Sequence, residues 1–370
     1  MSKAAELANL IGNINAGGGG ANKNVIINGA MNVAQRATSA TGLGSATGYN
    51  VCDRWVVGAS STNGRLTLSQ DSSAPSGFAN SLKFDCTTAD TSIASGENLN
   101  IQHRIEGQNL QAFAKGTSDA KPFALSFYVK GNASATYVAE LYDGDNNRQI
   151  SKTFSVTTDW TRVELTYPAD TTGAFNDDNA LSLYFLIHLH AGSTYSGGTL
   201  NSSSWASVTD ANRAVGISSF FDSTDRTFFI TGVQLEVGQN PTSFEIEPFD
   251  VTLEKCRRYY QQTSSNVQSS GFVYDNHPMC TYRFPVTMRT APTVALISGA
   301  YPDGNSSDNG GLSQKSGYGA IGYGSPTSAS FNTGTEYFRF FYQGGSFNSA
   351  PTEYGQGCMG NIAASMDAEL

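Results

Sequence analysis

The sequence predicts a mostly β protein with a short N-terminal helix, a jelly-roll-like antiparallel β-sandwich, a connecting helix and a smaller C-terminal β-domain. Two observations predict this class. Apolar residues alternate with polar ones, most clearly in Phe123–Val129 and Leu181–Leu189. Charged residues make up only 14% of the 370 residues, whereas glycine occurs 39 times. Strands with one apolar face, joined by turn residues, are typical of a two-layer antiparallel sandwich.

Residues 1–23 are expected to form an N-terminal helix and a glycine hinge. Within Ser2–Asn15, four apolar residues at helical spacing would share one face: Leu7, Leu10, Ile11 and Ile14. Gly17–Gly20 would end the helix. Because the rest of the chain offers no long helix as a partner, we expect this stripe to mediate docking or oligomerisation. The alternative is a helix folded back on its own domain.

Two further domains follow, at residues 24–248 and 249–370. In the first, the polar segment Gly192–Gly216 is too long for a hairpin turn, and long loops often carry function. The second begins with a helix expected over Asp250–Gln262. We expect its strands near Cys280–Val286, Thr293–Ile297 and Glu336–Tyr342.

Charge, apolar content and cysteine spacing argue against several classes of protein. The net charge is −9 and no Lys/Arg cluster occurs, so the chain is a poor candidate for nucleic-acid binding. No stretch approaches about 20 apolar residues, and the N-terminus lacks the apolar core of an export signal, so no membrane insertion is expected. Five widely spaced cysteines without a CxxC pair indicate reduced, buried thiols made in a cytoplasm.

Candidate metal ligands are weak. His188 and His190 stand two apart on a predicted strand and would share its more polar face, but a third and fourth zinc ligand cannot be placed. Asp143, Asp145 and Asn147 resemble the start of a calcium loop that lacks its final glutamate, so a hairpin turn is preferred. We therefore expect no metal and no cofactor.

Catalytic patterns are also missing from the sequence. Asp177-Asp178 and Asp222/Asp225 are the carboxylates that a glycosidase could use, yet they fall in expected turns. His103 is in phase with apolar neighbours and is expected to be a partly buried, hydrogen-bonded histidine. The prediction is a protein that is not an enzyme.

The final domain has the composition of a binding surface. Aromatic residues lie among Gly, Ser, Asn and Asp, a mixture of rigid rings and adaptable polar groups. Sugars stack on such rings, although each ring could instead pack a small β-core. With a tryptophan of the long loop, the candidate receptor-binding residues are Tyr301, Asp303, Tyr318, Tyr323, Phe347, Tyr354 and Trp205.

Six motifs occur in one order along the chain: NVIINGAMNVAQR from Asn24, YNVCDRW from Tyr49, FITGVQLEVG from Phe229, TSFEIEPF from Thr242, EKCRRYYQQ from Glu254 and FPVTMRTAPTV from Phe284. Together they resemble a family of bacteriophage tail-fibre and virion-appendage proteins with a carbohydrate-binding-module-like sandwich. They cover the two ends of the sandwich, the connecting helix and the start of the C-terminal domain.

The resemblance implies a homotrimeric virion protein. Its N-terminus would dock to other phage tail, neck or adaptor proteins, and its distal domain would contact a host surface polysaccharide. Arg54, Trp55, Gln234 and Glu236 would be scaffold residues. The N-terminal anchor is short and lacks a long shaft, which favours a short fibre or appendage. Two alternatives remain: a neck, collar or head decoration protein with no receptor role, and a glycan-degrading depolymerase.

Overall fold

The computed structural model describes most of the sandwich and parts of the C-terminal domain. The described residues are 3–4, 23–263, 267–274, 277–296, 312–316, 320–324, 328–343, 357–362 and 364–370. They divide into two compact units, Met1–Thr252 with Leu370, and Leu253–Glu369. The sequence places this boundary slightly earlier, between residues 248 and 249. Leu7, Leu10, Ile11 and Ile14 lie outside the described residues.

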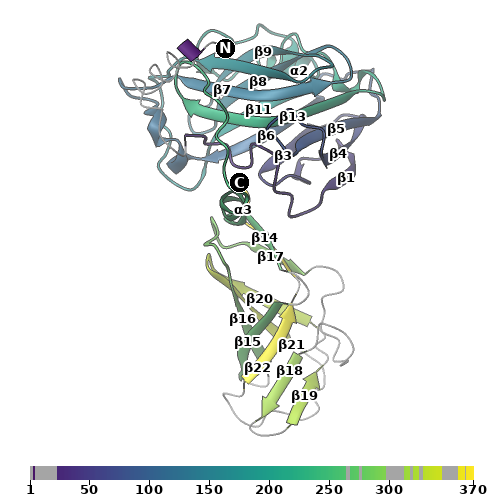
Figure 1. Ribbon diagram of the computed structural model, residues 1–370, viewed down its shortest axis with the longest axis vertical. Helices are drawn as coiled ribbons and strands as arrows, with labels where there is room; N and C mark the ends of the chain where they lie inside the picture. Colours follow the sequence, from purple (N-terminus) through teal and green to yellow (C-terminus); the bar gives the residue numbers. More distant parts are fainter. Residues whose placement is uncertain are drawn as a thin grey trace. The chain divides into compact units, whose positions relative to one another are not determined.

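The first unit is a β-sandwich of two antiparallel sheets, whose strands overlap in the view of Figure 1. Sheet A has the order β1 (Ser39–Leu43), β4 (Arg65–Asp71), β5 (Ser81–Thr88), β13 (Thr227–Val237), β7 (Phe123–Gly131), β10 (Thr161–Tyr167). Sheet B has the order β12 (Ala206–Ser207), β9 (Arg148–Val156), β8 (Ala135–Asp143), β11 (Leu181–Ala191), β6 (Asn98–Glu106), β3 (Trp55–Ser60), β2 (Gly48–Tyr49). The predicted fold class is confirmed.

The core lies between the two sheets and consists of the residues that alternate inward. Phe127 of β7 and Phe185 of β11 meet there with ring centroids 6.1 Å apart, and both are fully buried. Burying each such ring stabilises the fold by roughly 1.5–3 kcal/mol. The free cysteines Cys52, Cys86 and Cys256 are also buried, as the sequence predicts.

The segment before β1 is held by the turn at Asn28-Gly29. Asn28 has φ 58° and accepts a hydrogen bond from the Val33 amide at 3.0 Å through its side chain. The Trp55 indole donates to the Asn28 carbonyl at 3.1 Å. A side chain at Gly29 would collide with the Val233 carbonyl, since its Cβ would lie 2.1 Å from that oxygen. The NG motif therefore works as a structural turn.

The motif residues expected to be scaffold are buried and internally bonded. The buried Arg54 donates to the Arg104 carbonyl at 2.6 Å. Gln234 donates to Glu236 at 2.8 Å, and the Thr242 amide donates to Glu236 at 2.7 Å. These bonds tie β13 to the segment after it, which confirms the scaffold role.

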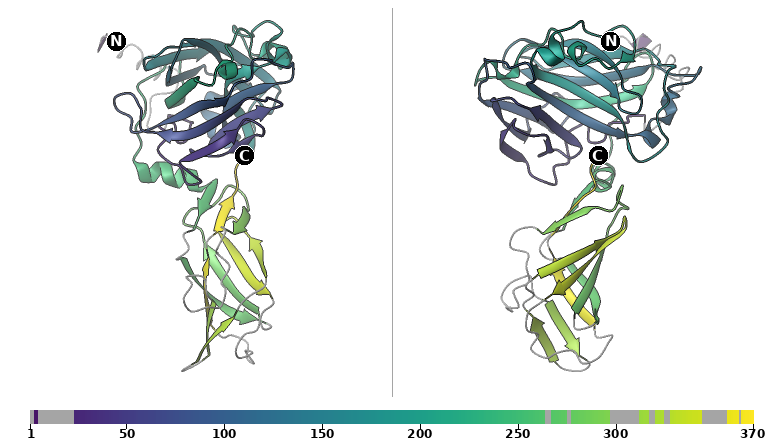
Figure 2. Two further views of the ribbon diagram at one scale, coloured as in Figure 1. Left: turned by 90° about the vertical axis from the view of Figure 1, so that its right-hand side faces the viewer. Right: turned by 180° about the vertical axis from the view of Figure 1, so that it is seen from behind.

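The second unit is also β-rich and appears as the green and yellow strands of Figures 1 and 2. The connecting helix α3 (Phe249–Arg257) ends earlier than expected. Tyr260–Gln262, expected to be helical, instead forms β14, because Tyr260 is buried and pairs with Asp367. A three-stranded sheet has the order β14, β23 (Ala364–Asp367), β17 (Thr293–Leu296).

A seven-stranded antiparallel sheet completes this unit. Its order is β19 (Ala320–Gly324), β18 (Leu312–Ser316), β22 (Gly357–Ile362), β15 (Val267–Tyr274), β16 (His277–Arg283), β21 (Tyr337–Gln343), β20 (Ser328–Thr333). The three strands that the sequence predicts correspond to β16 and β21 of this sheet and to β17. Within the part of the chain that the structure describes, no helix has the length and apolar character needed to cross a membrane.

Candidate functional site

The outer face of sheet B carries an aromatic and polar surface. Strand alternation buries Leu183 and Phe185 in the core and turns Tyr184 outward. Tyr184 stands directly opposite Tyr142 of β8 and Arg104 of β6. Because side chains opposite each other on antiparallel strands share one face, these three groups form a row across the sheet.

Tyr142 and Tyr184 form the aromatic part of this row. Their ring centroids are 5.3 Å apart with planes inclined by 30°. The guanidinium of Arg104 lies 5.8 Å from the Tyr184 ring and that of Arg213 lies 5.1 Å from the Tyr142 ring. Both tyrosines are half-buried. Partial burial raises the pKa of Tyr142, so its hydroxyl stays protonated and donates to Asn147 at 2.9 Å.

The outward side chains of β6 form a hydrogen-bonded series, which we call the β6 ladder: Asn98, Asn100, Gln102 and Arg104. Arg104 donates to Gln102 at 3.1 Å, Gln102 to Asn100 at 2.9 Å and Asn100 to Asn98 at 2.6 Å. Arg104 also donates to the backbone oxygen of Leu370. The ladder fixes the amide orientations at the surface.

Glycine at position 58 makes room for the β6 ladder. Gly58 of β3 pairs with Asn100. A Cβ at this position would lie 2.3 Å from Asn100 Oδ1 and 2.4 Å from Gln102 Nε2. Any other residue would therefore push the two amides aside.

A buried charge cluster holds the long loop against the same face. Glu140 of β8 accepts from Arg213 at 3.0 Å and pairs with His188 of β11 at 2.7 Å. Burial alone would raise the pKa of Glu140, but the His188 hydrogen bond and the Arg213 charge hold it below its usual value. This cluster, which we call the loop clamp, positions α2 (Ser193–Ser196) and the short helix Asp210–Asn212 beside β11 and β8.

The arrangement suits a ligand that lies on an open surface. Two cavities among the described residues have volumes of about 170 and 280 Å³, and the larger one is lined by Gln149, which stands directly opposite Tyr142. Both are smaller than the roughly 300–1,000 Å³ of small-molecule sites. Flat rings beside oriented amides can instead contact an extended ligand from the surface.

Most of the predicted receptor-binding residues lie in parts of the C-terminal domain that the structure does not describe. Tyr301, Asp303, Tyr318, Phe347 and Tyr354 lie outside the described residues, and Tyr323 is described only as part of β19.

Trp205 is the exception. It is 7% exposed, its ring lies 5.4 Å from Phe123, and its indole donates to the Pro168 carbonyl at 2.9 Å. Its ring is packed into the sandwich, so the prediction that this ring contacts a receptor does not fit its position.

The weak calcium candidate is a hairpin turn between β8 and β9. Asp143 pairs with the buried ammonium of Lys115 at 2.5 Å, and Asp145 accepts from the Asn176 amide at 3.0 Å. Asn147 has φ 51°, as in a tight turn. A calcium ion at Asp143 would have to displace a buried cation, which favours the hairpin turn that the sequence predicts.

His188 and His190 do not share a face, contrary to the prediction. The register shifts between them, with His188 opposite Asn100 and His190 opposite Leu99, a core residue. This β-bulge turns His190 inward, beside Phe221 at 5.3 Å. Period-two reasoning cannot detect such a bulge. His103 bonds to the Ile27 backbone, as expected, but it is fully buried where the sequence predicts partial burial.

The candidate catalytic carboxylates are surface groups. Asp222 pairs with Arg226 at 2.5 Å, and Asp178 accepts from the Ala180 amide at 2.9 Å. Asp177 and Asp225 are exposed. These four carboxylates do not form the facing pair that glycoside hydrolysis needs.

Sequence reasoning missed the tyrosine row. The alternation of the strand could have identified Tyr184 as an outward-facing residue, because it lies between predicted core residues of Leu181–Leu189. No sequence pattern links Tyr142 and Arg104 to Tyr184, because only the strand order of sheet B brings them beside it.

No protein-family model matches the sequence, and no curated protein matches it. The chain is similar to a solved CBM4 structure, with 11% identity and a TM-score of 0.30 over 57% of this chain and 99% of that one. It is also similar to a family 11 carbohydrate-binding module from Clostridium thermocellum in complex with a mixed-linked tetrasaccharide, with 10% identity and a TM-score of 0.27 over 56% and 99%.

A third similar structure is the enzymatically active domain of tailspike protein 4 of bacteriophage CBA120. The identity is 12% and the TM-score is 0.29, over 58% of this chain and 21% of that one. The chain thus spans about a fifth of that tailspike chain.

Proposed function

We propose that the chain is a non-enzymatic, glycan-binding virion protein, a short tail fibre or appendage that recognises a host surface polysaccharide. The observation that carries the binding part of this proposal is the row of Tyr142, Tyr184 and Arg104 beside the β6 ladder. The ordered phage-type motifs and the N-terminal apolar stripe support the virion part.

The outer face of sheet B offers both contacts that a sugar polymer needs. The apolar face of a sugar ring can stack on Tyr184 or Tyr142, and such rings bury large areas at little entropic cost. Hydroxyl groups can bond to the half-buried amide of Gln102, whose orientation is already fixed by its bond to the buried Asn100. Because each hydrogen bond contributes only about 1 kcal/mol net, recognition would depend on several sugar units.

The virion part explains the remaining sequence features. The stripe of Leu7, Leu10, Ile11 and Ile14 would assemble a homotrimer or dock it to tail, neck or adaptor proteins. The protein would be made in the cytoplasm of the infected bacterium and end in the particle. The aromatic residues of the C-terminal domain would supply a second, distal contact.

The binding part is tested with the full-length protein on an array of bacterial surface glycans. Tyr184→Ala and Tyr142→Ala should each weaken binding by at least about tenfold, because each removes a ring from the stacking surface. Tyr128→Ala is the matched control, since Tyr128 is a half-buried tyrosine on sheet A. It should bind as the unaltered protein does.

The two alternative functions predict other outcomes of this experiment. A neck, collar or head decoration protein would bind no glycan on the array. A depolymerase would release reducing ends from the polysaccharide it binds. If only alanine substitutions of Tyr301, Tyr318 and Tyr354 weakened binding, the receptor site would lie in the C-terminal domain and the sheet B site would be wrong.

A further inference from the structure

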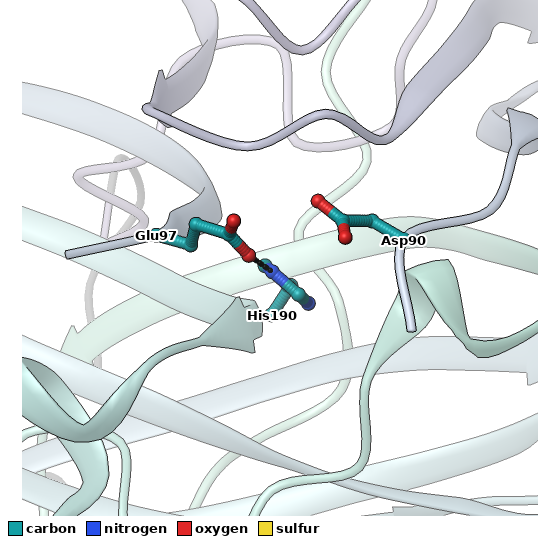
Figure 3. Close-up of side chains that lie close together, drawn as sticks. All are labelled: Asp90, Glu97 and His190. Atoms are coloured by element: carbon teal, nitrogen blue, oxygen red, sulfur yellow. Dashed lines mark hydrogen bonds and ion pairs between the residues drawn. The ribbon is translucent and has the colours of Figure 1, made fainter. Parts of the chain in front are cut away.

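Three ionisable side chains meet inside the sandwich, away from the outer face of sheet B. Asp90 follows β5, Glu97 precedes β6, and His190 lies at the bulge near the end of β11. Figure 3 shows their side chains turned toward one another. One donor atom from each lies within 4.8 Å of the other two, and the three residues are 5%, 1% and 0% exposed.

The donor geometry fits a single ion. His190 Nε2 lies 3.1 Å from Glu97 Oε2. Two ligands on one zinc ion, each at about 2.0–2.1 Å, stand about 3.3 Å apart when the geometry is tetrahedral. A donor oxygen of Asp90 lies within 4.8 Å of a donor atom of each of these two residues.

The surroundings of His190 fix the ring as a metal ligand requires. Ser219 Oγ lies 2.8 Å from His190 Nδ1 and also accepts from the Phe221 amide at 3.1 Å. When Nδ1 donates to that oxygen, the lone pair of Nε2 faces the two carboxylates. A second group that holds the other ring nitrogen is the usual companion of a metal-bound histidine.

The charges of the three side chains also favour a bound cation. Asp90 accepts from the Asn63 amide at 2.8 Å and the Thr62 hydroxyl at 3.1 Å. Both donors are neutral groups, so neither balances a charge on the Asp90 carboxylate. Among the described residues, no Lys or Arg forms an ion pair with Asp90 or Glu97. Two buried carboxylates therefore face one imidazole.

We propose that Asp90, Glu97 and His190 form a structural site for a divalent metal ion of the zinc class. One imidazole and two carboxylates suit Zn²⁺ better than Ca²⁺, which prefers oxygen ligands alone. A water molecule or a second carboxylate oxygen would complete the coordination. The ion would link the segment between β5 and β6 to the end of β11, where the long loop begins. The site is independent of glycan binding.

The test measures metal content and thermal unfolding of the purified full chain. Mass spectrometry of metals should find about one zinc per chain. Chelation should lower Tm by at least about 3 °C, and Zn²⁺ should restore it where Ca²⁺ and Mg²⁺ do not. His190→Gln and Asp90→Asn should lose the zinc and the response to chelation.

His188→Gln is the matched control, because His188 lies on the same strand and pairs with a buried glutamate in the same way. It should retain the zinc. X-ray absorption at the zinc edge of the unaltered protein should show one imidazole and only nitrogen and oxygen ligands, a result that does not depend on any variant folding.

Three results would overturn the site. The folded protein could hold no stoichiometric metal and show no Zn²⁺-dependent Tm, which would leave a buried His190–Glu97 pair. Zinc could persist in both His190→Gln and Asp90→Asn, which would place it elsewhere. Ca²⁺ could be bound in place of Zn²⁺, which would contradict the zinc class.

Discussion

At the scale of single residues, a few side chains and one glycine determine the structure of the outer face of sheet B. Gly58 leaves the space that Asn100 and Gln102 fill, and Tyr184 lies in the adjoining row. None of these residues belongs to a sequence motif. Their role depends on neighbours that are distant in the chain, so the sequence could predict the strands but not the surface they form.

Gly58→Ala should weaken glycan binding by about fivefold to tenfold, because the new methyl group disorders the amides of the β6 ladder. The displaced atoms are the ends of flexible side chains, so the free energy of unfolding should change by less than about 1 kcal/mol. Calorimetric titration and urea denaturation measure the two effects.

Gly96→Ala is the control for this substitution, since a Cβ at Gly96 would meet no atom within 4 Å. It should change neither quantity. Equal glycan affinity for Gly58→Ala and the unaltered protein would show that the ladder takes no part in binding.

At the scale of elements, the alternation of apolar and polar residues predicts the sandwich strands but not their irregularities. The alternation in Phe123–Val129 and Leu181–Leu189 predicts β7 and most of β11. The bulge between His188 and His190, the early end of α3 and the burial of Trp205 could not be predicted. Each depends on packing against a distant segment, which local patterns do not contain.

The loop clamp gives sheet B a pH dependence. The pKa of Glu140 is lower in the folded protein than its ordinary value of 4.5, so the unfolded chain binds more protons. Its stabilising contribution is therefore complete above that ordinary value and is lost as the pH falls through the folded pKa. Glu140→Gln should cost about 3–5 kcal/mol at pH 7 and flatten the decline below pH 5.

Urea denaturation between pH 3.5 and pH 7 measures this change. Glu164→Gln is the control, because Glu164 forms an exposed ion pair with Arg162. That substitution should cost less than about 1 kcal/mol. A Glu140→Gln protein as stable as the control at pH 7 would show that the clamp contributes nothing.

At the scale of the whole molecule, the sequence predicts assembly through residues that the structure does not describe. A homotrimer would have a mass near 118 kDa, three times the 39.2 kDa of one chain. Leu7→Asp combined with Leu10→Asp should reduce it to the monomer, because charges would line the apolar stripe. Light scattering measures the mass.

Asn9→Asp is the control for assembly, since residue 9 would lie on the opposite side of the helix. It should leave the trimer intact. A mass near 39.2 kDa for the unaltered protein would contradict the predicted role of the stripe.

The proposed function depends above all on glycan binding by the outer face of sheet B. A crystal structure of the full chain with an oligosaccharide from the glycan array tests it most directly. We expect a sugar ring stacked on Tyr184 or Tyr142, with hydroxyl groups bonded to Gln102. A sugar bound only to the C-terminal domain, with the tyrosine row unoccupied, would contradict the account.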